Sequence, residues 1–211
     1  MITSTIAVAA LALAASLLLT RAMIAVAPRV GLVDRPGERR IHTAEIPRAG
    51  GIAVWLAFLA AGFLALEVFP GPGGFTWEWF RAFAFSSGIL MAIGIIDDRY
   101  GITAWQKLAG QLAVAVLLFF AQGGGVGMFV GVDVPWWLDL AIWTVWMLAI
   151  VNAFNLIDGL DGLCAGLAVI SVSALAALTF FAGRTGDALV MLAMLGALLG
   201  FLRFNFHPAR I

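Results

Sequence analysis

Long apolar stretches constrain most strongly what this 211-residue chain can fold into. Crossing the hydrocarbon core of a bilayer, about 30 Å thick, takes roughly 20 mostly apolar residues as an α-helix. Stretches near that length recur along the whole chain, and the third is among the shortest. They cover residues 3–27, 50–69, 80–96, 104–121, 136–153, 162–182 and 187–203. The sequence therefore predicts an all-α, polytopic membrane protein with about seven transmembrane helices, forming one integral-membrane domain over residues 1–211.

Composition supports this class and excludes others. Hydrophobic residues make up 63% of the chain and charged residues 11%, whereas about a quarter of a typical soluble domain is charged. The formal net charge is zero, so nothing indicates a nucleic-acid partner. The single cysteine, Cys164, cannot form an internal disulfide, and we interpret it as a small core residue.

Basic residues predict the orientation of the helices. With the N-terminus outside, ten Lys or Arg residues fall on the inner side, and only Arg81 and Arg184 fall on the outer side. Positive residues concentrate on the cytoplasmic side of membrane proteins. We therefore expect a periplasmic N-terminus and a cytoplasmic C-terminus. The acids of the outer side look like ordinary solvated interface residues, namely Glu67, Glu78, Asp133, Asp139 and Asp187.

Four amide or carboxylate residues recur at a spacing of three near the end of the fifth apolar stretch, at Asn152, Asn155, Asp158 and Asp161. On a helix, successive members of such a series are turned by about 60°, so they would project from adjacent parts of one surface. Polar groups at the edge of a membrane span are costly unless they face a cavity, a metal ion or a polar substrate. This series is the first candidate site, although we expect residues 154–161 to form an inner loop.

A second cluster ends the third apolar stretch. The adjacent carboxylates Asp97 and Asp98 lie where a helix C-terminus already carries partial negative charge. A divalent metal, a basic side chain or a shared proton should offset them, unless they are two solvated loop acids beside Arg99. Lys107 should start the next helix near the same interface, either as a snorkelling anchor or as a phosphate ligand.

The loop of residues 28–49 is basic and rich in proline and glycine. Five arginines face three acids there, and Gly50 and Gly51 open the following helix. Arginine side chains and the free N–H groups of a helix N-terminus both bind phosphate groups. The preference of basic residues for the cytoplasmic side explains part of the positive charge of this loop. The candidate ligands are Arg35, Arg39, Arg40 and Arg48.

Taken together, these clusters place arginines, carboxylates and amides on the inner face. Such residues could catalyse a reaction that joins two phosphorylated substrates, one soluble and one carried by a lipid. The carboxylates would bind Mg²⁺ or accept a proton. The residues alone leave two readings open, a membrane phosphotransferase or an ion-coupled transporter. The transporter is disfavoured because the only acids between residues 104 and 153 are Asp133 and Asp139, near the outer turn.

Four motifs in this order resemble the polyprenyl-phosphate N-acetylhexosamine-1-phosphate transferases. They are the loop from Gly31-Leu-Val-Asp34-Arg35-Pro36 through Arg39-Arg40-Ile-His42 to Pro47-Arg48-Ala-Gly50-Gly51, the Asp97-Asp98 pair, the segment from Asn152 to Asp161, and the ending Phe204-Asn-Phe-His207-Pro-Ala-Arg210-Ile211. The loop is similar to that of enzymes that start O-antigen, enterobacterial common antigen or teichoic-acid linkage synthesis.

The resemblance implies a reaction and roles for residues. A UDP-N-acetylhexosamine and a polyprenyl phosphate would give a polyprenyl-diphospho-sugar and UMP, with Mg²⁺ as cofactor, as the initiating step of cell-envelope glycan synthesis. Asp97 and Asp98 match the catalytic pair, Lys107 a lysine that contacts the lipid phosphate, and Asn155 a ligand of Mg²⁺. Asn152, Asp158, Asp161 and the four loop arginines match positions that line or support the nucleotide-sugar pocket.

The resemblance also indicates what is missing. The family continues with a Phe-Met-Gly-Asp-type segment, whose aspartate is another Mg²⁺ ligand, and later with a His-x-x-His-type loop. We therefore expect a chain truncated at its C-terminal end, and a second hypothesis is a catalytically incomplete membrane protein that binds or assembles without turnover. His207 matches no metal-binding spacing and is interpreted as an interface residue. A bacterial inner membrane is the expected location, and a homodimer is left open.

Overall fold

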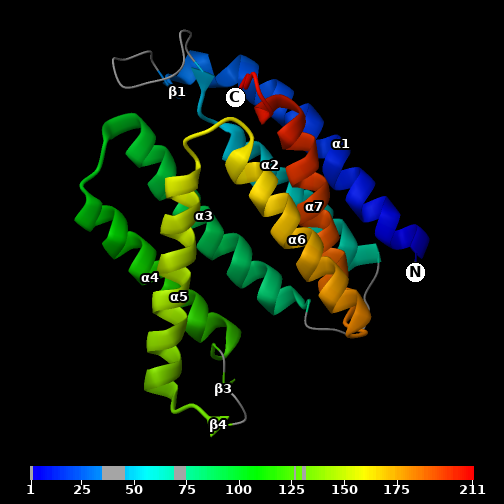
Figure 1. The fold of residues 1–211 in the computed structure, drawn as a ribbon, viewed down its shortest axis with the longest axis vertical. Coiled ribbons are helices and arrows are strands. Elements are labelled where there is room, and N and C mark those ends of the chain that lie inside the picture. Colours follow the sequence, from blue (N-terminus) through cyan, green and yellow to red (C-terminus); the bar gives the residue numbers. More distant parts are fainter. Residues whose placement is uncertain (1, 35–45, 69–74, 126, 130–131) are drawn as a thin grey trace. The chain divides into compact units, whose positions relative to one another are not determined.

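The computed structural model describes residues 2–34, 46–68, 75–125, 127–129 and 132–211 (Figure 1). Within these residues, seven helices are long and apolar enough to cross a membrane. The prediction of an all-α polytopic protein is confirmed. The helices belong to two compact units, one formed by Met1–Thr76 with Asp158–Ile211 and the other by Trp77–Ile157. That all 211 residues act as one domain stays a prediction.

The first unit contains four long helices, α1 (Ile2–Val26), α2 (Gly50–Val68), α6 (Leu163–Phe181) and α7 (Thr185–Asn205). A short 3₁₀ helix, Ala27–Val30, follows α1, and the two-residue strands β1 (Val33–Asp34) and β2 (Ile46–Pro47) pair antiparallel. Helix α7 contacts α1, α2 and α6, so it is the central helix of this unit.

Small residues let α1 and α7 approach closely. A side chain at Gly196 would meet the backbone oxygen of Ala9, and one at Gly200 would meet the backbone oxygen of Leu13. The Ser16 hydroxyl donates a hydrogen bond of 2.6 Å to the carbonyl oxygen of Ala197. Membrane helices commonly associate through glycines four residues apart, because backbones then pack directly. The order of these contacts shows that α1 and α7 run parallel, so both C-terminal ends lie at the same end of the unit.

The second unit is built from three long helices, α3 (Trp77–Tyr100), α4 (Ala104–Gln122) and α5 (Trp136–Ile157). The strands β3 (Met128–Phe129) and β4 (Val132–Asp133) pair antiparallel between α4 and α5. Helix α4 contacts both α3 and α5. Large apolar side chains of α5 are exposed, including Val145, Trp146 and Ile150, as expected of a helix that faces lipid.

Two sequence-based boundaries were wrong. The third helix is 24 residues long rather than among the shortest, because α3 continues through Asp97 and Asp98 to Tyr100. Helix α5 continues to Ile157, so Asn155 lies on a helix and not in a loop. Hydropathy windows stop where polar residues begin, whereas a helix continues while its backbone hydrogen bonds are satisfied.

The prediction for the outer acids was also wrong in part. Asp139 is only 4% exposed, and its Oδ2 accepts a hydrogen bond of 3.0 Å from the backbone N–H of Gly125. Asp139 therefore holds the loop after α4 against the start of α5. Asp187, in the first turn of α7, forms an ion pair with Arg184. Both acids have structural partners that a composition argument could not identify.

Candidate active site

A tight turn between α3 and α4 creates the centre of the candidate site. Gly101 has a positive φ of 65°, and its N–H donates to the carbonyl oxygen of Asp97, which ends α3. Thr103 then caps α4: its side chain accepts the N–H of Gln106, while the Gln106 side chain accepts the N–H of Thr103. This reciprocal cap is a strong start signal for a helix. The turn places Lys107, in the first turn of α4, opposite the last turn of α3.

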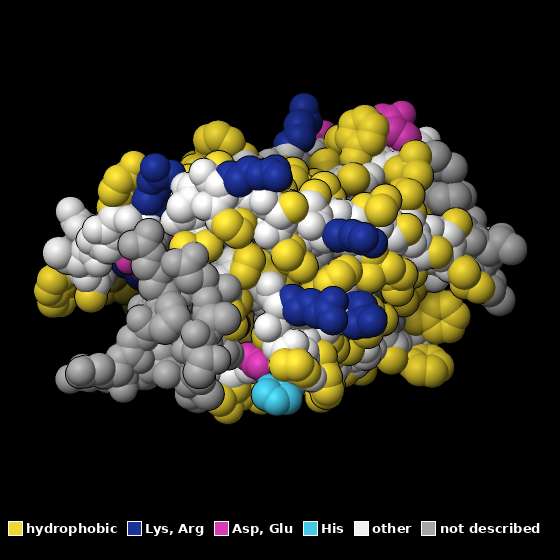
Figure 2. All heavy atoms as spheres, turned by 90° about the horizontal axis from the view of Figure 1, so that it is seen from above, with side chains coloured by type: hydrophobic (Ala, Val, Ile, Leu, Met, Phe, Trp, Pro, Cys, Tyr) yellow, Lys and Arg dark blue, Asp and Glu magenta, His cyan; other side chains and the backbone are white. Residues whose placement is uncertain are grey.

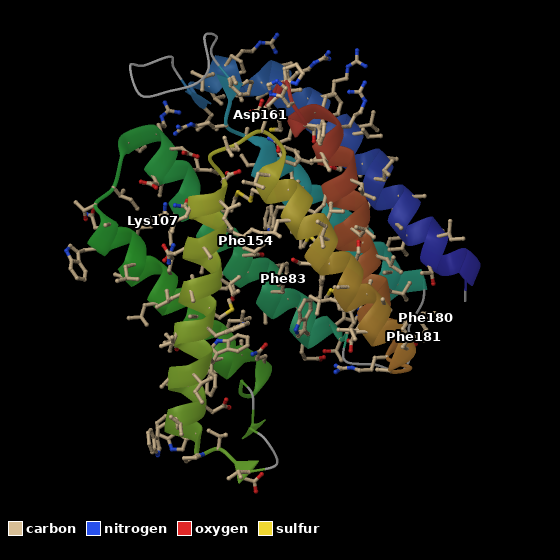
Figure 3. The ribbon with its side chains drawn as sticks, in the orientation of Figure 1. Phe83, Lys107, Phe154, Asp161, Phe180 and Phe181 are labelled. Carbon is tan, nitrogen blue, oxygen red and sulfur yellow. The ribbon has the colours of Figure 1, made fainter. Side chains whose placement is uncertain are left out.

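Lys107 joins all three helices of the second unit. Its Nζ donates to Oδ2 of Asp97 at 2.9 Å and to Oδ1 of Asn155 at 3.4 Å. The side chains of Lys107 and Asp97 are 25% and 27% exposed, so the ion pair is only partly screened by water. The other carboxylate oxygen of Asp97 accepts the N–H of Ile102 at 3.2 Å. Figure 3 shows Lys107 on α4 with its side chain towards α5.

The sequence predicted Asp97 and Lys107 near one interface and Asn155 in a separate series, and the structure brings all three into one cluster. Asp98, the next residue on α3, is exposed at the same helix end. A carboxylate, an ammonium and an amide oxygen gathered at the ends of three apolar helices can bind a phosphate group and orient it. We call Asp97, Lys107 and Asn155 the lysine cluster.

One polar residue next to this cluster was missed by the sequence interpretation. Gln111 lies one helical turn after Lys107 and is only 5% exposed. Its Oε1 accepts a hydrogen bond of 2.8 Å from Nδ2 of Asn152, one turn before Asn155 on α5. The signal was present in the sequence, because a glutamine four residues after a lysine shares its helix face.

The donor types of the site suit Mg²⁺. Carboxylate and amide oxygens, as supplied by Asp97, Asp98 and Asn155, are the ligands that this hard cation prefers. In the part of the chain that the structure describes, no group of three or more His, Cys, Asp or Glu side chains is placed to hold a metal ion. The oxygens of Asp97, Asp98 and Asn155 fit Mg²⁺ in chemical type, and the Lys107 ammonium lies beside one oxygen of Asp97 and the oxygen of Asn155.

The Asn/Asp series does not form one helical surface. Asn152 and Asn155 lie on α5 in the second unit, whereas Asp158 and Asp161 lie in the turn that begins the return of the chain to the first unit. Asp158 is exposed, and Asp161 is half-buried. The spacing of three predicted a common surface only while the helix continued, and α5 ends at Ile157.

Asp161 organises the last residues of the chain. Its Oδ2 lies 3.0 Å from Nδ1 of His207 and accepts the N–H of Ala209 at 3.0 Å. Beside it, Oδ1 of Asn205 accepts the N–H of Gly162 at 3.2 Å, and Nδ2 of Asn205 donates to the carbonyl oxygen of Ile211. Figure 3 labels Asp161 near the start of α6. His207, interpreted from sequence as an interface residue, thus has a carboxylate partner.

Five described arginines of the first unit lie at one end of it, whereas Arg184 lies at the other end, at the start of α7. Arg21, Arg29, Arg48, Arg203 and Arg210 all lie at or beyond the ends of α1 and α7 or before α2. Figure 2 shows basic side chains among apolar ones on the face seen from above. Arg48 is exposed, and its backbone N–H donates to the carbonyl oxygen of Leu32. The other predicted ligands of this loop, Arg35, Arg39 and Arg40, lie outside the described residues.

Comparison with known proteins identifies a family. The family model of glycosyl transferase family 4 matches residues 80–211. A probable undecaprenyl-phosphate N-acetylglucosaminyl 1-phosphate transferase of Bacillus subtilis (strain 168) is 34% identical over 203 residues, which covers 92% of this chain and 54% of that protein.

Two further relatives give the same picture. The decaprenyl-phosphate N-acetylglucosaminephosphotransferase of Mycobacterium tuberculosis (strain ATCC 25618 / H37Rv) is 36% identical, over 88% of this chain and 50% of that protein. The undecaprenyl-phosphate alpha-N-acetylglucosaminyl 1-phosphate transferase of Salmonella typhi is 30% identical, over 85% of this chain and 48% of that protein. The chain spans about half the length of these relatives.

Proposed function

Because the chain belongs to glycosyl transferase family 4, we propose that it transfers N-acetylhexosamine 1-phosphate from a UDP-sugar to a polyprenyl phosphate and releases UMP. The names of the relatives support a polyprenyl phosphate acceptor and an N-acetylglucosamine group. The product, a polyprenyl-diphospho-sugar, would start the synthesis of a cell-envelope glycan.

The reaction is a phosphoryl transfer between two anions. An oxygen of the lipid phosphate attacks the β-phosphorus of the UDP-sugar and forms the new diphosphate bond. The bond between the β-phosphorus and the bridging oxygen breaks, and that oxygen leaves on UMP with the electron pair. Catalysis of such a step depends mainly on positioning and on stabilising negative charge.

The single observation that carries this proposal is the lysine cluster. Lys107 is a cation fixed by Asp97 and Asn155 at the end of three apolar helices, where a lipid phosphate would meet the protein. Its ammonium can bind a phosphate oxygen as a point charge, while Asp97 keeps the side chain oriented. Asp98, exposed at the same helix end, would accept a proton from a protonated lipid phosphate.

We assign Mg²⁺ to the same site. Asn155 would supply one oxygen ligand and the Asp97-Asp98 pair a nearby negative potential, and the remaining positions would be water or diphosphate oxygens. When bound, Mg²⁺ would neutralise charge on the diphosphate.

The nucleotide-sugar would be held by the polar residues that precede α6 and α2. Asp158 is exposed in the turn before α6, and Asp161 fixes that turn against the end of the chain. Arg48 is an exposed cation just before α2, and Arg35, Arg39 and Arg40 belong to the same basic segment of the sequence. Asn152 was also predicted here, but its amide faces Gln111.

The charges also support an orientation. At one end of the first unit lie five arginines, and at its other end Arg184 is paired with Asp187. We therefore place the arginine end and the active face in the cytoplasm, and the protein in a bacterial inner membrane. Reporter fusions after Val26 and after Phe181 would test this, since the first should report the cytoplasm and the second the periplasm.

The decisive experiment is release of UMP from UDP-N-acetylglucosamine by the purified chain in detergent. Turnover that needs both undecaprenyl phosphate and Mg²⁺, and that Lys107→Met removes, is the expected result. A folded sample that binds the lipid or the nucleotide-sugar without turnover would instead establish the alternative, a non-catalytic binding or assembly protein. Turnover that is indifferent to Lys107→Met would overturn the assignment of the site.

A further inference from the structure

Helices α4 and α5 are joined by a series of polar contacts that run antiparallel along both helices. Lys107 contacts Asn155, and Gln111, one turn later on α4, contacts Asn152, about one turn earlier on α5. Further along, Nε1 of Trp143 donates to the carbonyl oxygen of Ala115 at 3.0 Å. These contacts fix how far one helix can slide along the other.

Gln111 is the buried side chain of this series. Gln111 is 5% exposed, whereas the side chain of Lys107 is 25% exposed. A buried amide that loses its partner costs roughly 1–3 kcal/mol, and water cannot replace the partner inside a membrane span. The contact of the buried Gln111 with Asn152 therefore defines the register more strongly than the more exposed contact of Lys107 with Asn155 does.

The amide nitrogen of Asn152 is fully engaged in the protein. Its two N–H groups donate to Oε1 of Gln111 at 2.8 Å and to the carbonyl oxygen of Leu148 at 2.8 Å. An amide nitrogen has two protons, so no donor on Asn152 remains for a nucleotide. This arrangement indicates a different role from the nucleotide contact that the sequence suggested.

We infer that Gln111 and Asn152 form a positioning pair that sets the register of α4 against α5 and thereby keeps Oδ1 of Asn155 beside the Lys107 ammonium, which the α3–α4 turn holds against Asp97. Neither residue touches substrate in this assignment. Lys107 is one turn from Gln111, and Asn155 is three residues from Asn152, so a shift at the pair is carried rigidly to the lysine cluster. The kinetic consequence rests on the proposed transferase function, whereas the geometric consequence does not.

A direct test uses the fact that Lys107 is the only lysine in the sequence. Reductive methylation of the purified protein with ¹³C-formaldehyde marks Lys107 and the N-terminal amine, and the rate of modification of Lys107 is measured by peptide mass spectrometry. In Gln111→Met or Asn152→Leu, loss of the Asn155 oxygen from the Lys107 ammonium should raise that rate by about threefold or more. Gln122→Met, the same substitution near the other end of α4, should leave it unchanged.

Exchange of the two amides separates positioning from simple damage. Gln111→Asn shortens one side chain, and combining it with Asn152→Gln lengthens the other, so the double variant can close the same gap. We expect slow, wild-type modification of Lys107 to return in the double variant. Variants that fold only poorly, with no recovery in the exchanged pair, would show a role in stability alone and would overturn the inference.

Steady-state kinetics then distinguish the two roles of Asn152. If Asn152 is a positioning residue, Asn152→Leu and Gln111→Met should both lower kcat by about tenfold or more. Both variants should leave the KM for UDP-N-acetylglucosamine unchanged. A raised KM in Asn152→Leu with a normal kcat in Gln111→Met would restore the nucleotide contact and reject the pair. Absence of turnover in the wild type would defeat the proposed function, and the methylation rates would still decide the positioning inference.

Discussion

The Lys107 ammonium lies 2.9 Å from the Asp97 carboxylate, although ten residues separate them and they belong to different helices. The contact depends on the turn at Gly101 and on the Thr103–Gln106 cap, which together reverse the chain in three residues. The amine of Lys107 is thus held at the end of three helices, at a place where an anion can approach it.

Substitution of Lys107 should separate charge from size. Lys107→Met should lower the rate of UMP release by about 100-fold or more, because one oriented charge that stabilises a transition state is worth that much. Lys107→Arg should retain part of the rate, since the charge remains but the planar guanidinium cannot occupy the same position between Asp97 and Asn155. A Lys107→Met protein that turns over at the wild-type rate would contradict a phosphate-binding role.

The two adjacent aspartates should differ in one measurable respect. Asp97→Asn and Asp98→Asn should each remove turnover, but only Asp97→Asn should speed the modification of Lys107, because only Asp97 is bonded to it. Membrane insertion and gel-filtration profile serve as controls of folding. Near-normal turnover in Asp98→Asn would remove that residue from the catalytic assignment.

Packing of α1 against α7 should not tolerate a side chain at Gly196. A Cβ atom there would meet the backbone of Ala9, so Gly196→Val must push the helices apart. We expect a loss of about 1–3 kcal/mol in the free energy of unfolding, measured as a lower midpoint of thermal unfolding in detergent. Gly166→Val on α6, where a Cβ would meet nothing within 4 Å, is the matched control and should have a thermal midpoint near that of the wild type.

At the opposite end of the second unit from the lysine cluster, Asp139→Leu should destabilise the protein. It removes the carboxylate that accepts the Gly125 N–H, and a lost hydrogen bond to a charged group costs roughly 1.5–3 kcal/mol. The exposed Asp133→Leu is the comparison, and its thermal midpoint should stay near that of the wild type. Equal midpoints for both variants would mean that the acceptor is not required.

Release of the chain end should be visible in hydrogen exchange. Asp161→Leu removes the acceptor of the Ala209 N–H, so exchange at Ala209 should accelerate. Asp161→Asn keeps one oxygen and should have an intermediate rate. The Phe206 N–H, bonded to the carbonyl oxygen of Leu202 in the backbone, provides an internal reference that should not change.

The fold class could be predicted from the sequence because membrane insertion depends on local composition. Each of the seven helices is a continuous apolar segment whose backbone satisfies itself, so a window of residues contains enough information. The ends of α3 and α5 were wrong, since Asp97, Asp98 and Asn155 are polar yet helical. Hydropathy measures transfer into lipid and does not measure hydrogen bonding in the last turn.

For the candidate site too, the sequence predicted one part and the tertiary structure decided the other. The residue types of Asp97, Lys107 and Asn155, and their position near helix ends on one predicted side, followed from sequence alone. That they meet in one cluster, that Gln111 supports them through Asn152, and that Asp161 binds the end of the chain were decided by the tertiary structure. Distances between helices depend on packing and on turns such as that at Gly101, and neither is encoded in the spacing of residues within a single helix.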